Sequence, residues 1–512
     1  MRILEQWHAL AGAHQLDFRV RVPVCIIVIR TLFLIGLILG SGSRICFVEA
    51  ESAESAESTE ADTAAQSRLG GRDFDPIGAE LPVPQVHSVE LSIDDRRFSI
   101  EQRVSNRKSK IDNRKFQGVG VPVPQAHPVG LHDTLRIVHL SGSPYELGYQ
   151  HGSILREEVR ASVSRILQYF HRYLKLPFIR SWLASLWLAK VWQKARPFVA
   201  ADYLEELRGL SDGSGVALRE LYQLHAIPDR TYACSGFAAW GRATEDGRLI
   251  HLRNLDWNID AGIQEFATLF VVRPQKRHAF VNVGWAGFIG VLTGVNDRQL
   301  SIGQIGSETV DATFRGEPMV FVMRRVMEQA NDLDSAIAII NLAPRTVGVN
   351  YVLADAKARR AVVMETTHRH CRAFEANDPG ERAVSYARPL VDAVLRADTA
   401  MDPQIRNLQL ASNGDPNRAG LEDPTGSSAY DVRYLGQAAG LSAHFGSLTP
   451  QKAQQIARTV GPSSNVQSVI IAWPELWVAN AHGKTRATAG RFQKLSLEHL
   501  FATFDTTPVD NP

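Results

Sequence analysis

Apolar residues recur in short blocks from residue 135 onward, and their spacing predicts both strands and helices. Residues 135–140 form an apolar block that predicts a strand. Ser143 and Pro144 follow as the cap and first position of a helix, which the pattern carries to about residue 167. A second helix is predicted over residues 178–196, between two prolines.

A β-hairpin is the clearest local signal in the chain. Runs at 237–240 and 249–252 are joined through a polar turn at 244–247, whose Asp-Gly pair is a strong hairpin signal. Cys234 then stands at the open end of the first strand. The returning strand brings Arg253 and Asp256 back to that same end.

Strands, then helices, then strands again are predicted after the hairpin. The predicted strands span residues 268–272, 279–283, 290–293, 300–302, 350–354 and 361–365, and the predicted helices span residues 321–329 and 333–341. Pattern alone therefore predicts a fold that mixes α and β elements.

Residues 1–50 have the pattern of an export signal. A basic start precedes an apolar stretch at 22–40 that Arg30 interrupts, and residues 48–50 have the small-residue pattern of a cleavage site. The piece after Arg30 is too short to span a bilayer alone, so we expect a cleaved signal peptide. The alternative is an uncleaved membrane anchor over residues 22–39. Either one predicts export to the periplasm or the extracellular space.

Residues 51–133 have the composition of a disordered linker. A Glu-Ser-Ala repeat at 51–58 opens it, and too few large apolar residues follow to offset the entropy of ordering. The run Leu-Pro-Val-Pro-Gln-Val-His at 81–87 recurs at 121–127 with two changes. Its prolines favour an extended conformation, which suits a passive spacer or, alternatively, a docking segment.

Length and charge bound the remaining possibilities. At 512 residues the chain is long enough for two or three average domains, or for one large domain with a tail. A net charge of +2, from 56 basic and 54 acidic residues, indicates no nucleic-acid partner. The four cysteines are scattered without a Cys-x-x-Cys pair, so neither a disulfide framework nor a metal site is expected. No Gly-rich phosphate loop appears, and no cofactor is expected.

Candidate chemistry gathers at the open end of the hairpin. A free cysteine has a pKa of about 8.5 and only its thiolate attacks, so a fixed positive charge such as Arg253 would raise the reactive fraction of Cys234. Asp256 can hold Arg253 through a bidentate pair, or accept a hydrogen bond from an amine on the nucleophile. The alternative interpretation is a buried cysteine beside a surface ion pair.

These residues resemble a known family. The Cys-Ser-Gly-Phe run at 234–237 and the Arg-Asn-Leu-Asp-Trp run at 253–257 are similar to the N-terminal-nucleophile (Ntn) hydrolases of the penicillin acyltransferase group, which are relatives of choloylglycine hydrolase and acid ceramidase. Similar motifs lie upstream at 142–152 and downstream at 284–296 and 350–355. The resemblance implies an α+β fold, a four-layer αββα sandwich.

The resemblance also implies a division of the chain and a set of roles. Residues 134–500 would form the catalytic domain, with a pro-segment at 134–233 and a mature chain at 234–500. The precursor would cut itself before Cys234, and the new α-amino group, with a pKa near roughly 7.7 to 8, would act as the general base. Arg253 and Asp256 would orient the nucleophile and the substrate.

Residues that contact the substrate are also implied by the resemblance. Trp257 and Arg433 would lie in the substrate site, although a surface arginine is an equal alternative for Arg433. Relatives place an oxyanion-stabilising asparagine in a Thr-Asn-His run, and we align residues 385–387 with it. Tyr386 or Asn350 would then be the donor in this chain.

The implied function is an exported hydrolase or acyltransferase that cleaves a linear amide bond through a cysteine thioester. Its substrate would be a small N-acyl amide or a peptide-like molecule. One alternative is an unprocessed thiol hydrolase that pairs Cys234 with His151 or His251. The other is a non-catalytic, surface-tethered binding module on the same scaffold.

The helix predicted at 178–196 carries three tryptophans among basic residues. Such a helix can lie on a membrane surface or cover an acyl-binding site. The five-residue spacing of Trp182, Trp187 and Trp192 spreads the rings around the helix, which favours an ordinary packed helix.

Overall fold

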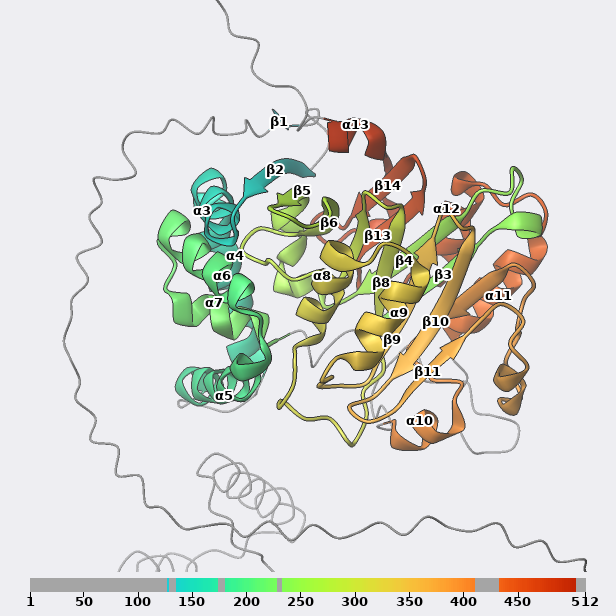
Figure 1. Cartoon of the computed structure of the whole chain (residues 1–512), viewed down its shortest axis with the longest axis horizontal. Coiled ribbons are helices and arrows are strands. Elements are labelled where there is room, and N and C mark those ends of the chain that lie inside the picture. Colours follow the sequence, from blue (N-terminus) through green and yellow to red (C-terminus); the bar gives the residue numbers. More distant parts are fainter. Residues whose placement is uncertain (1–126, 129–134, 174–179, 228–232, 410–431, 503–512) are drawn as a thin grey trace, which may run out of the picture. The chain divides into compact units, whose positions relative to one another are not determined.

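The structure of this chain is a computed structural model. It describes residues 127–128, 135–173, 180–227, 233–409 and 432–502, shown in colour in Figure 1. The expected signal peptide or anchor at 1–50 lies outside these residues, and so does nearly all of the expected linker at 51–133. The described residues belong to one compact unit that spans residues 121–512.

The described residues form two sheets, and the larger of them has nine strands. In spatial order they are β1 (His127–Pro128), β2 (Arg136–Gly142), β5 (Ala267–Pro274), β6 (Phe280–Trp285), β7 (Thr293–Asn296), β8 (Leu300–Gly306), β9 (Val349–Asp355), β10 (Arg360–Thr366) and β11 (Cys371–Phe374). β2 runs parallel to β5, with Val138 opposite Phe270, and the other neighbours are antiparallel. Two strands that precede Cys234 thus extend a sheet built by the chain that follows it.

The smaller sheet has six strands. In spatial order they are β12 (Ala393–Arg396), β3 (Ala233–Ala239), β4 (Ile250–Asp256), β13 (Asn465–Ala472), β14 (Glu475–Asn480) and β15 (Gln493–Ser496). β3 and β4 form the predicted hairpin, with Cys234 opposite Leu255. The connection is longer than the predicted turn at 244–247, because residues 240–249 all lie between the two strands. The backbone N–H of Trp240 bonds to the Asp392 carbonyl oxygen at 2.9 Å, which ties this loop to the chain before β12.

The two sheets pack face to face, with β3, β4 and β12 against β8, β9 and β10. Helices α8 (Met319–Gln329) and α9 (Leu333–Leu342) cover the larger sheet, and α11 (Val432–Ala443) and α12 (Pro450–Val460) cover the smaller one (Figure 1). Central strands such as β4 and β9 are buried at every position because both of their faces are covered. The prediction of a mixed α and β fold is confirmed.

Five helices that precede Cys234 gather beside one end of the sheets (Figure 1). They are α3 (Pro144–Ile154), α4 (Arg156–Tyr173), α5 (Arg180–Ala195), α6 (Ala201–Ser214) and α7 (Leu218–His225). Two short helices, α10 (Pro403–Leu408) and α13 (Leu497–Ala502), complete the described set. Among the helices that the structure describes, none is long and apolar enough to cross a membrane.

The predicted start of the first helix is confirmed. Ser143 is the N-cap of α3, and a reciprocal pair of hydrogen bonds joins it to Glu146, while Pro144 occupies the first turn. The predicted length was wrong, because the helix ends at Ile154 with Leu155 as its C-cap, and α4 begins directly after it. The break lets α3 lie along α6 while α4 packs against α5 and α7.

Glycines set the approach of α3 to α6. A Cβ atom at Gly148 would lie 1.9 Å from the Glu206 carbonyl oxygen, and one at Gly209 would lie 2.1 Å from the Tyr145 carbonyl oxygen. Only glycine permits such close backbones. The backbones of α3 and α6 are therefore in direct contact at these glycines.

The tryptophans of α5 that can be described face the interior. Trp192 is buried and stacks on Tyr222, with ring centroids 4.6 Å apart. Trp187 stacks on Phe170 at 5.9 Å, and Trp182 lies outside the residues whose side chains are described. The packed-helix interpretation is confirmed for these two rings.

One predicted strand was misplaced. A strand was expected at residues 290–293, but the strand in this region is β7, which begins only at Thr293. Residues 290–292 form a buried loop under α8. The amide Nδ2 of Asn282 donates to the Gly290 carbonyl oxygen at 3.0 Å, and a Cβ atom at Gly290 would lie 2.7 Å from Val320 Cβ. Packing against the helix, which local periodicity does not encode, excludes an extended strand there.

Candidate active site

The hairpin brings Cys234 and Arg253 into contact. The Nη2 atom of Arg253 lies 3.3 Å from the Cys234 Sγ atom. Gly236 pairs with Arg253 across the two strands. Gly236 is two positions after Cys234, so Arg253 and Cys234 lie on the same face of the sheet. A Cβ atom at Gly236 would lie 2.8 Å from the Leu252 carbonyl oxygen, so glycine keeps the two strands close.

The facing sheet holds Arg253 in place. Its Nε atom donates to the Gln304 carbonyl oxygen at 3.1 Å, and its Nη2 atom donates to Gln304 Oε1 at 3.1 Å. Gln304 Oε1 also lies 3.8 Å from the Cys234 sulfur. Gly303 leaves room for this arginine, because a Cβ atom there would lie 2.8 Å from Arg253 Cγ. A guanidinium that is only 1% exposed is thus fixed beside the thiol.

Asp256 lies at the same end of the hairpin and is also buried. Its Oδ1 atom accepts a hydrogen bond from Asn465 Nδ2 at 2.9 Å, and its Oδ2 atom pairs with Arg433 Nη1 at 3.3 Å. Burial raises the pKa of the Asp256 carboxyl to about 6, although the charges of Arg433 and Arg253 and the Asn465 hydrogen bond oppose the rise. The carboxyl group therefore depends on its partners to remain ionised.

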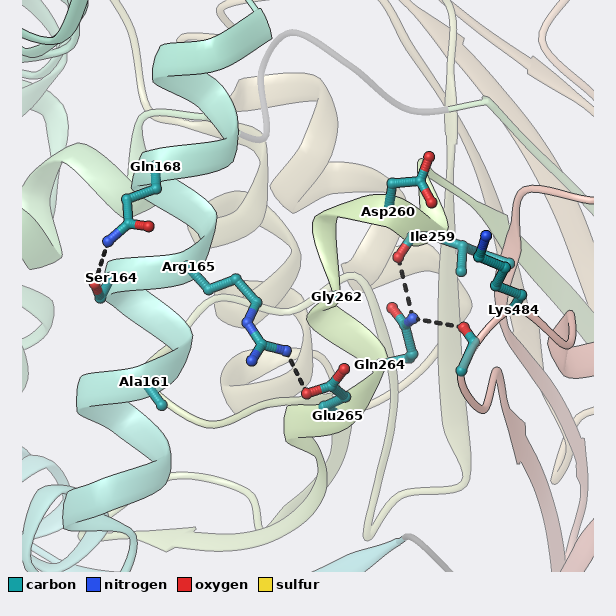
Figure 2. Close-up of a pocket in the computed structure, with 11 residues that line it drawn as sticks. Ala161, Ser164, Arg165, Gln168, Ile259, Asp260, Gly262, Gln264, Glu265 and Lys484 are labelled. Atoms are coloured by element: carbon teal, nitrogen blue, oxygen red, sulfur yellow. Dashed lines mark hydrogen bonds and ion pairs between the residues drawn. The ribbon is translucent and has the colours of Figure 1, made fainter.

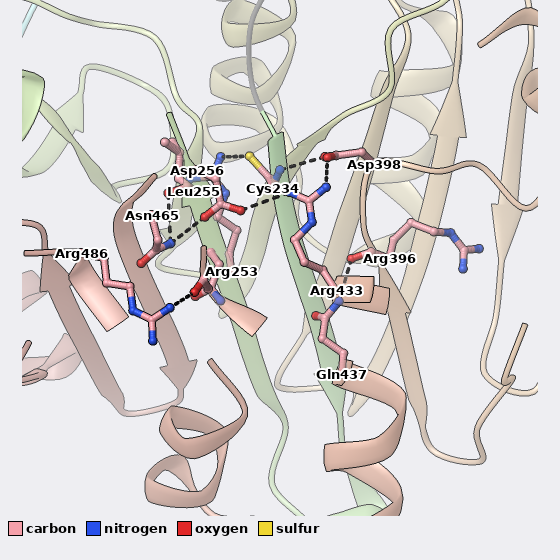
Figure 3. A network of polar contacts seen from close by, with 12 residues as sticks. Cys234, Arg253, Leu255, Asp256, Arg396, Asp398, Arg433, Gln437, Asn465 and Arg486 are labelled. Carbon is pink, nitrogen blue, oxygen red and sulfur yellow. Dashed lines mark hydrogen bonds and ion pairs between the residues drawn. The ribbon is translucent and has the colours of Figure 1, made fainter. Parts of the chain in front are cut away.

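A second carboxylate, Asp398, reaches the backbone nitrogen of Cys234 (Figure 3). The Cys234 N–H donates to Asp398 Oδ1 at 2.8 Å, and Arg433 Nη2 pairs with Asp398 Oδ2. Asp398 follows β12, which pairs with β3 and sets Arg396 opposite Gly236. Arg433 therefore bridges Asp256 and Asp398, the two carboxylates on either side of the nucleophile candidate.

The thiol is not ionised in the intact chain at neutral pH. Burial raises the pKa of Cys234 to about 11, the Arg253 charge opposes the rise, and the charges of Asp256 and Asp398 add to it. The thiol therefore needs a base to take its proton as it attacks.

The other predicted site residues have mixed outcomes. Arg433 is buried and bridges two carboxylates, so the surface-arginine alternative was wrong. The surface ion pair in the alternative interpretation of Cys234 was also wrong, because these charges are buried. Trp257 contacts Tyr169 edge to face at 5.8 Å, and it lines a small apolar cavity of about 20 Å³ with Trp285 and Phe288.

The two candidate oxyanion donors have other contacts. The Tyr386 hydroxyl accepts from Arg406 Nη1 at 3.3 Å. Asn350 Nδ2 donates to the Ala397 carbonyl oxygen at 3.0 Å. The segment that reaches Cys234 holds Asp398, whereas residues 385–387 had been aligned there.

The candidate histidine partners make contacts away from the thiol. The Nδ1 atom of His251 lies 2.8 Å from Ser301 Oγ, and His251 is four positions before Leu255 on β4, or about 13 Å along the strand. The Nε2 atom of His151 accepts the Gly287 N–H at 2.9 Å. Burial lowers the pKa of both histidines to about 3, so both are neutral.

Three polar residues of the site were missed by sequence reasoning: Gln304, Asp398 and Asn465. The predicted strand at 300–302 stopped before Gln304, and the short strand before Asp398 was not predicted. An apolar run at 393–395, with the acidic Asp398 three positions after it, was the available signal. Among the described residues, no group of three or more His, Cys, Asp or Glu side chains could hold a metal ion.

A larger cavity of about 560 Å³ lies where α4 meets the chain that follows Asp256 (Figure 2). Gln264 Nε2 donates to the carbonyl oxygens of Ile259 and Gly483 at 3.1 and 3.0 Å, and Arg165 forms an ion pair with Glu265. Its lining is polar and does not include Cys234. The cavity is therefore separate from the thiol.

Comparison with known proteins matches one family model. The model of acyl-coenzyme A:6-aminopenicillanic acid acyl-transferase matches residues 242–384, a range that includes Arg253 and Asp256 and begins after Cys234. Protein dcd1B of Dictyostelium discoideum is 29% identical over 262 residues, which are 48% of this chain and 52% of that protein.

Two relatives with named activities are more distant. N-acylethanolamine-hydrolyzing acid amidase of Cavia porcellus is 19% identical over 185 residues, which are 35% of this chain and 51% of that protein. Acid ceramidase of Rattus norvegicus is 24% identical over 192 residues, which are 32% of this chain and 48% of that protein. The chain spans about half the length of the curated relatives it matches. Residues 242–384 are therefore similar to the acyl-coenzyme A:6-aminopenicillanic acid acyl-transferase family, and part of the chain is similar to acid ceramidase, in line with the resemblance of the run at 253–257.

Proposed function

We propose that this chain is a self-processing Ntn hydrolase or acyltransferase whose nucleophile is Cys234. Two contacts of this one residue carry the proposal. Its sulfur lies against the buried Arg253 guanidinium, and its backbone nitrogen lies against the Asp398 carboxylate. Cleavage before Cys234 would turn that nitrogen into a primary amine beside the thiol that needs a base.

In the first step the Cys234 sulfur attacks the carbonyl carbon of Ala233. The C–N bond between the two residues breaks, the thiol proton moves to the nitrogen, and a thioester joins Ala233 to the sulfur. Water then hydrolyses this thioester and leaves a carboxylate on Ala233 and a free thiol on Cys234. The products are a pro-segment that ends at residue 233 and a mature chain that begins with the nucleophile.

In turnover the free α-amine of Cys234 takes the thiol proton, and the sulfur attacks the carbonyl carbon of an amide. Arg253 stabilises the thiolate, and backbone N–H groups near the nucleophile stabilise the oxyanion of the tetrahedral intermediate. The ammonium then gives its proton to the departing amine. Water, or an amine in the case of transfer, takes the acyl group from the resulting thioester.

The names of one relative and of the matching family model, together with the apolar side chains near Trp257, support the proposed substrate class. One relative is an amidase that hydrolyses N-acylethanolamines by its name, and the matching family model is an acyl-transferase. Apolar side chains around Trp257, including Trp285 and Phe288, favour an apolar acyl group. A small N-acyl amide is therefore the proposed substrate.

The proposal also includes the αββα fold and export of the protein. Helices on both outer faces of two packed sheets suit the αββα layers of Ntn hydrolases. The apolar stretch and cleavage pattern within residues 1–50 support export, with membrane attachment if that segment stays uncut.

Mass spectrometry of the purified protein tests the central step. We expect the parent chain to split between Ala233 and Cys234, and a Cys234→Ala variant to remain intact. A thiol-reactive acyl probe should label residue 234 of the split protein. An active parent that stays whole would instead support a thiol hydrolase without processing, and a parent that neither splits nor takes the probe would support a binding module.

A further inference from the structure

Asp398 contacts the one nitrogen that self-cleavage would free. In the intact chain the Cys234 N–H donates to Asp398 Oδ1 at 2.8 Å. The sulfur of the same residue faces the opposite charge, because Arg253 Nη2 lies 3.3 Å from it. One residue thus has an anionic carboxylate at its nitrogen and a cationic guanidinium at its sulfur.

The Asp398 carboxylate is held firmly in this position. Its Oδ2 atom pairs with Arg433, whose side chain is only 3% exposed. Its backbone carbonyl oxygen accepts a hydrogen bond from Gln409 Nε2 at 2.8 Å. The pairing of β12 with β3 fixes the chain just before Asp398. A carboxylate that is paired with a buried arginine, on a backbone that is itself held, can act on a charge beside it without first having to move.

We propose that Asp398 is the positioning residue for the α-amino group of Cys234 after cleavage, and that it holds this group as an ammonium beside the thiolate. The inference rests on the proposed self-cleavage. It makes the resting nucleophile an ion pair within one residue, ready to attack a carbonyl group and then to protonate the leaving amine.

The charged groups around this nitrogen alternate in sign. Arg253 faces the thiolate, the ammonium faces Asp398, and Arg433 joins Asp398 to Asp256. An opposite charge within hydrogen-bond distance stabilises the protonated amine and so raises its pKa. Arg433 limits the rise, because it shares the Asp398 carboxylate. The ammonium would then persist above the pH at which an ordinary α-amine loses its proton, roughly 7.7 to 8.

The pH dependence of kcat/KM separates this role from a structural one. The ion pair is lost on the alkaline side when the ammonium gives up its proton. Asp398→Asn keeps an oxygen that can accept from the amine but removes the negative charge. In this variant we expect the midpoint of the alkaline decline in kcat/KM to lie about one pH unit or more below that of the parent. An unchanged alkaline limb in a correctly split Asp398→Asn protein would overturn the proposal.

Asp392→Asn is the matched control. Asp392 lies just before the same strand, and it accepts the Arg242 backbone N–H at 2.9 Å. Its backbone φ of 52° is a conformation that asparagine tolerates. We expect this variant to keep the pH profile of the parent.

A direct titration covers the case in which Asp398→Asn does not split. The parent chain is labelled with ¹⁵N-cysteine, and the nitrogen of residue 234 in the split protein is followed by NMR. A midpoint above about 8 supports the proposal, and a midpoint at or below the ordinary value for an α-amine overturns it. Failure of the parent to split, seen by mass spectrometry, would count against the proposed function itself and is distinguished from both results.

Discussion

Arg324 of α8 forms a two-fold hydrogen-bonded ion pair with Glu206 of α6, with N to O distances of 2.8 and 2.6 Å. Both side chains are at most 4% exposed. The same guanidinium bonds to Glu328, and the Tyr203 hydroxyl donates to Glu328 at 3.1 Å. A buried polar network thus joins the proposed pro-segment to the proposed mature chain.

The first prediction concerns this network. Arg324→Met leaves the buried Glu206 carboxylate without its cation, while Glu328 keeps a longer ion pair with Arg277 at 3.6 Å. Loss of one partner of such a buried pair costs about 3–5 kcal/mol. We expect the free energy of unfolding to fall by that amount in denaturant titrations of the Cys234→Ala background, which keeps the chain whole. Arg156→Met, at an exposed position of α4, should change it by less than about 0.5 kcal/mol. An equal decrease in the free energy of unfolding in the two variants would contradict a stabilising role for the buried ion pair.

The second prediction concerns Arg253. Arg253→Met removes a charge-assisted hydrogen bond to the Cys234 sulfur, which contributes about 1.5–3 kcal/mol. We expect the rate of self-cleavage, followed by gel electrophoresis after synthesis, to fall by about 10- to 100-fold. Arg248→Met, which loses an ion pair with Asp246 at the far end of the hairpin, should split at the rate of the parent.

The third prediction concerns stability at acidic pH. Burial, together with the charges of His225 and Arg324, lowers the pKa of His151 to about 3. The unfolded chain therefore binds a proton at this position below its ordinary pKa of about 6.5, whereas the folded chain does not. Its contribution to stability is complete above pH 6.5 and is lost as the pH falls toward 3.

His151→Gln tests that contribution. Glutamine has an oxygen that can replace the Nε2 acceptor for the Gly287 N–H, and it does not titrate. We expect the slope of the unfolding free energy against pH, between about pH 4 and 6, to decrease by up to about 1.4 kcal/mol per pH unit. The comparison with the parent cancels the opposite trend from carboxyl groups with raised pKa values, such as Glu206 at about 7. Parallel curves for variant and parent would contradict the assignment of a neutral His151.

The fourth prediction concerns Trp257. Burying a large apolar side chain against a ligand contributes about 1.5–3 kcal/mol. We expect Trp257→Ala to raise KM for a long-chain N-acyl amide by about tenfold or more, with a smaller effect on a short-chain one. Trp477→Ala is the control. Trp477 lies on β14, which β13 separates from β4, and its ring contacts Glu475 and Lys494. Equal effects of both variants on both substrates would exclude Trp257 as part of the acyl site.

Local signals predicted several elements correctly. The cap at Ser143 is formed by residues within one helical turn, so its pattern is visible in a short window. The hairpin that contains Cys234 and Arg253 also joins neighbouring runs of the chain. Errors arose where distant packing intervened: α3 and α4 divide at Leu155 to meet different helices, and the loop at 290–292 is held under α8.

The sequence by itself determined which end of the hairpin holds the thiol and which cation returns to it, because both follow from the alternation and turn of two adjacent strands. Only the tertiary structure decided what else meets them. Gln304 comes from the facing sheet, and Asp398 lies 164 positions from Cys234 along the chain. Such contacts depend on how two sheets pack and on the register of strands that are far apart in sequence, and local periodicity contains neither.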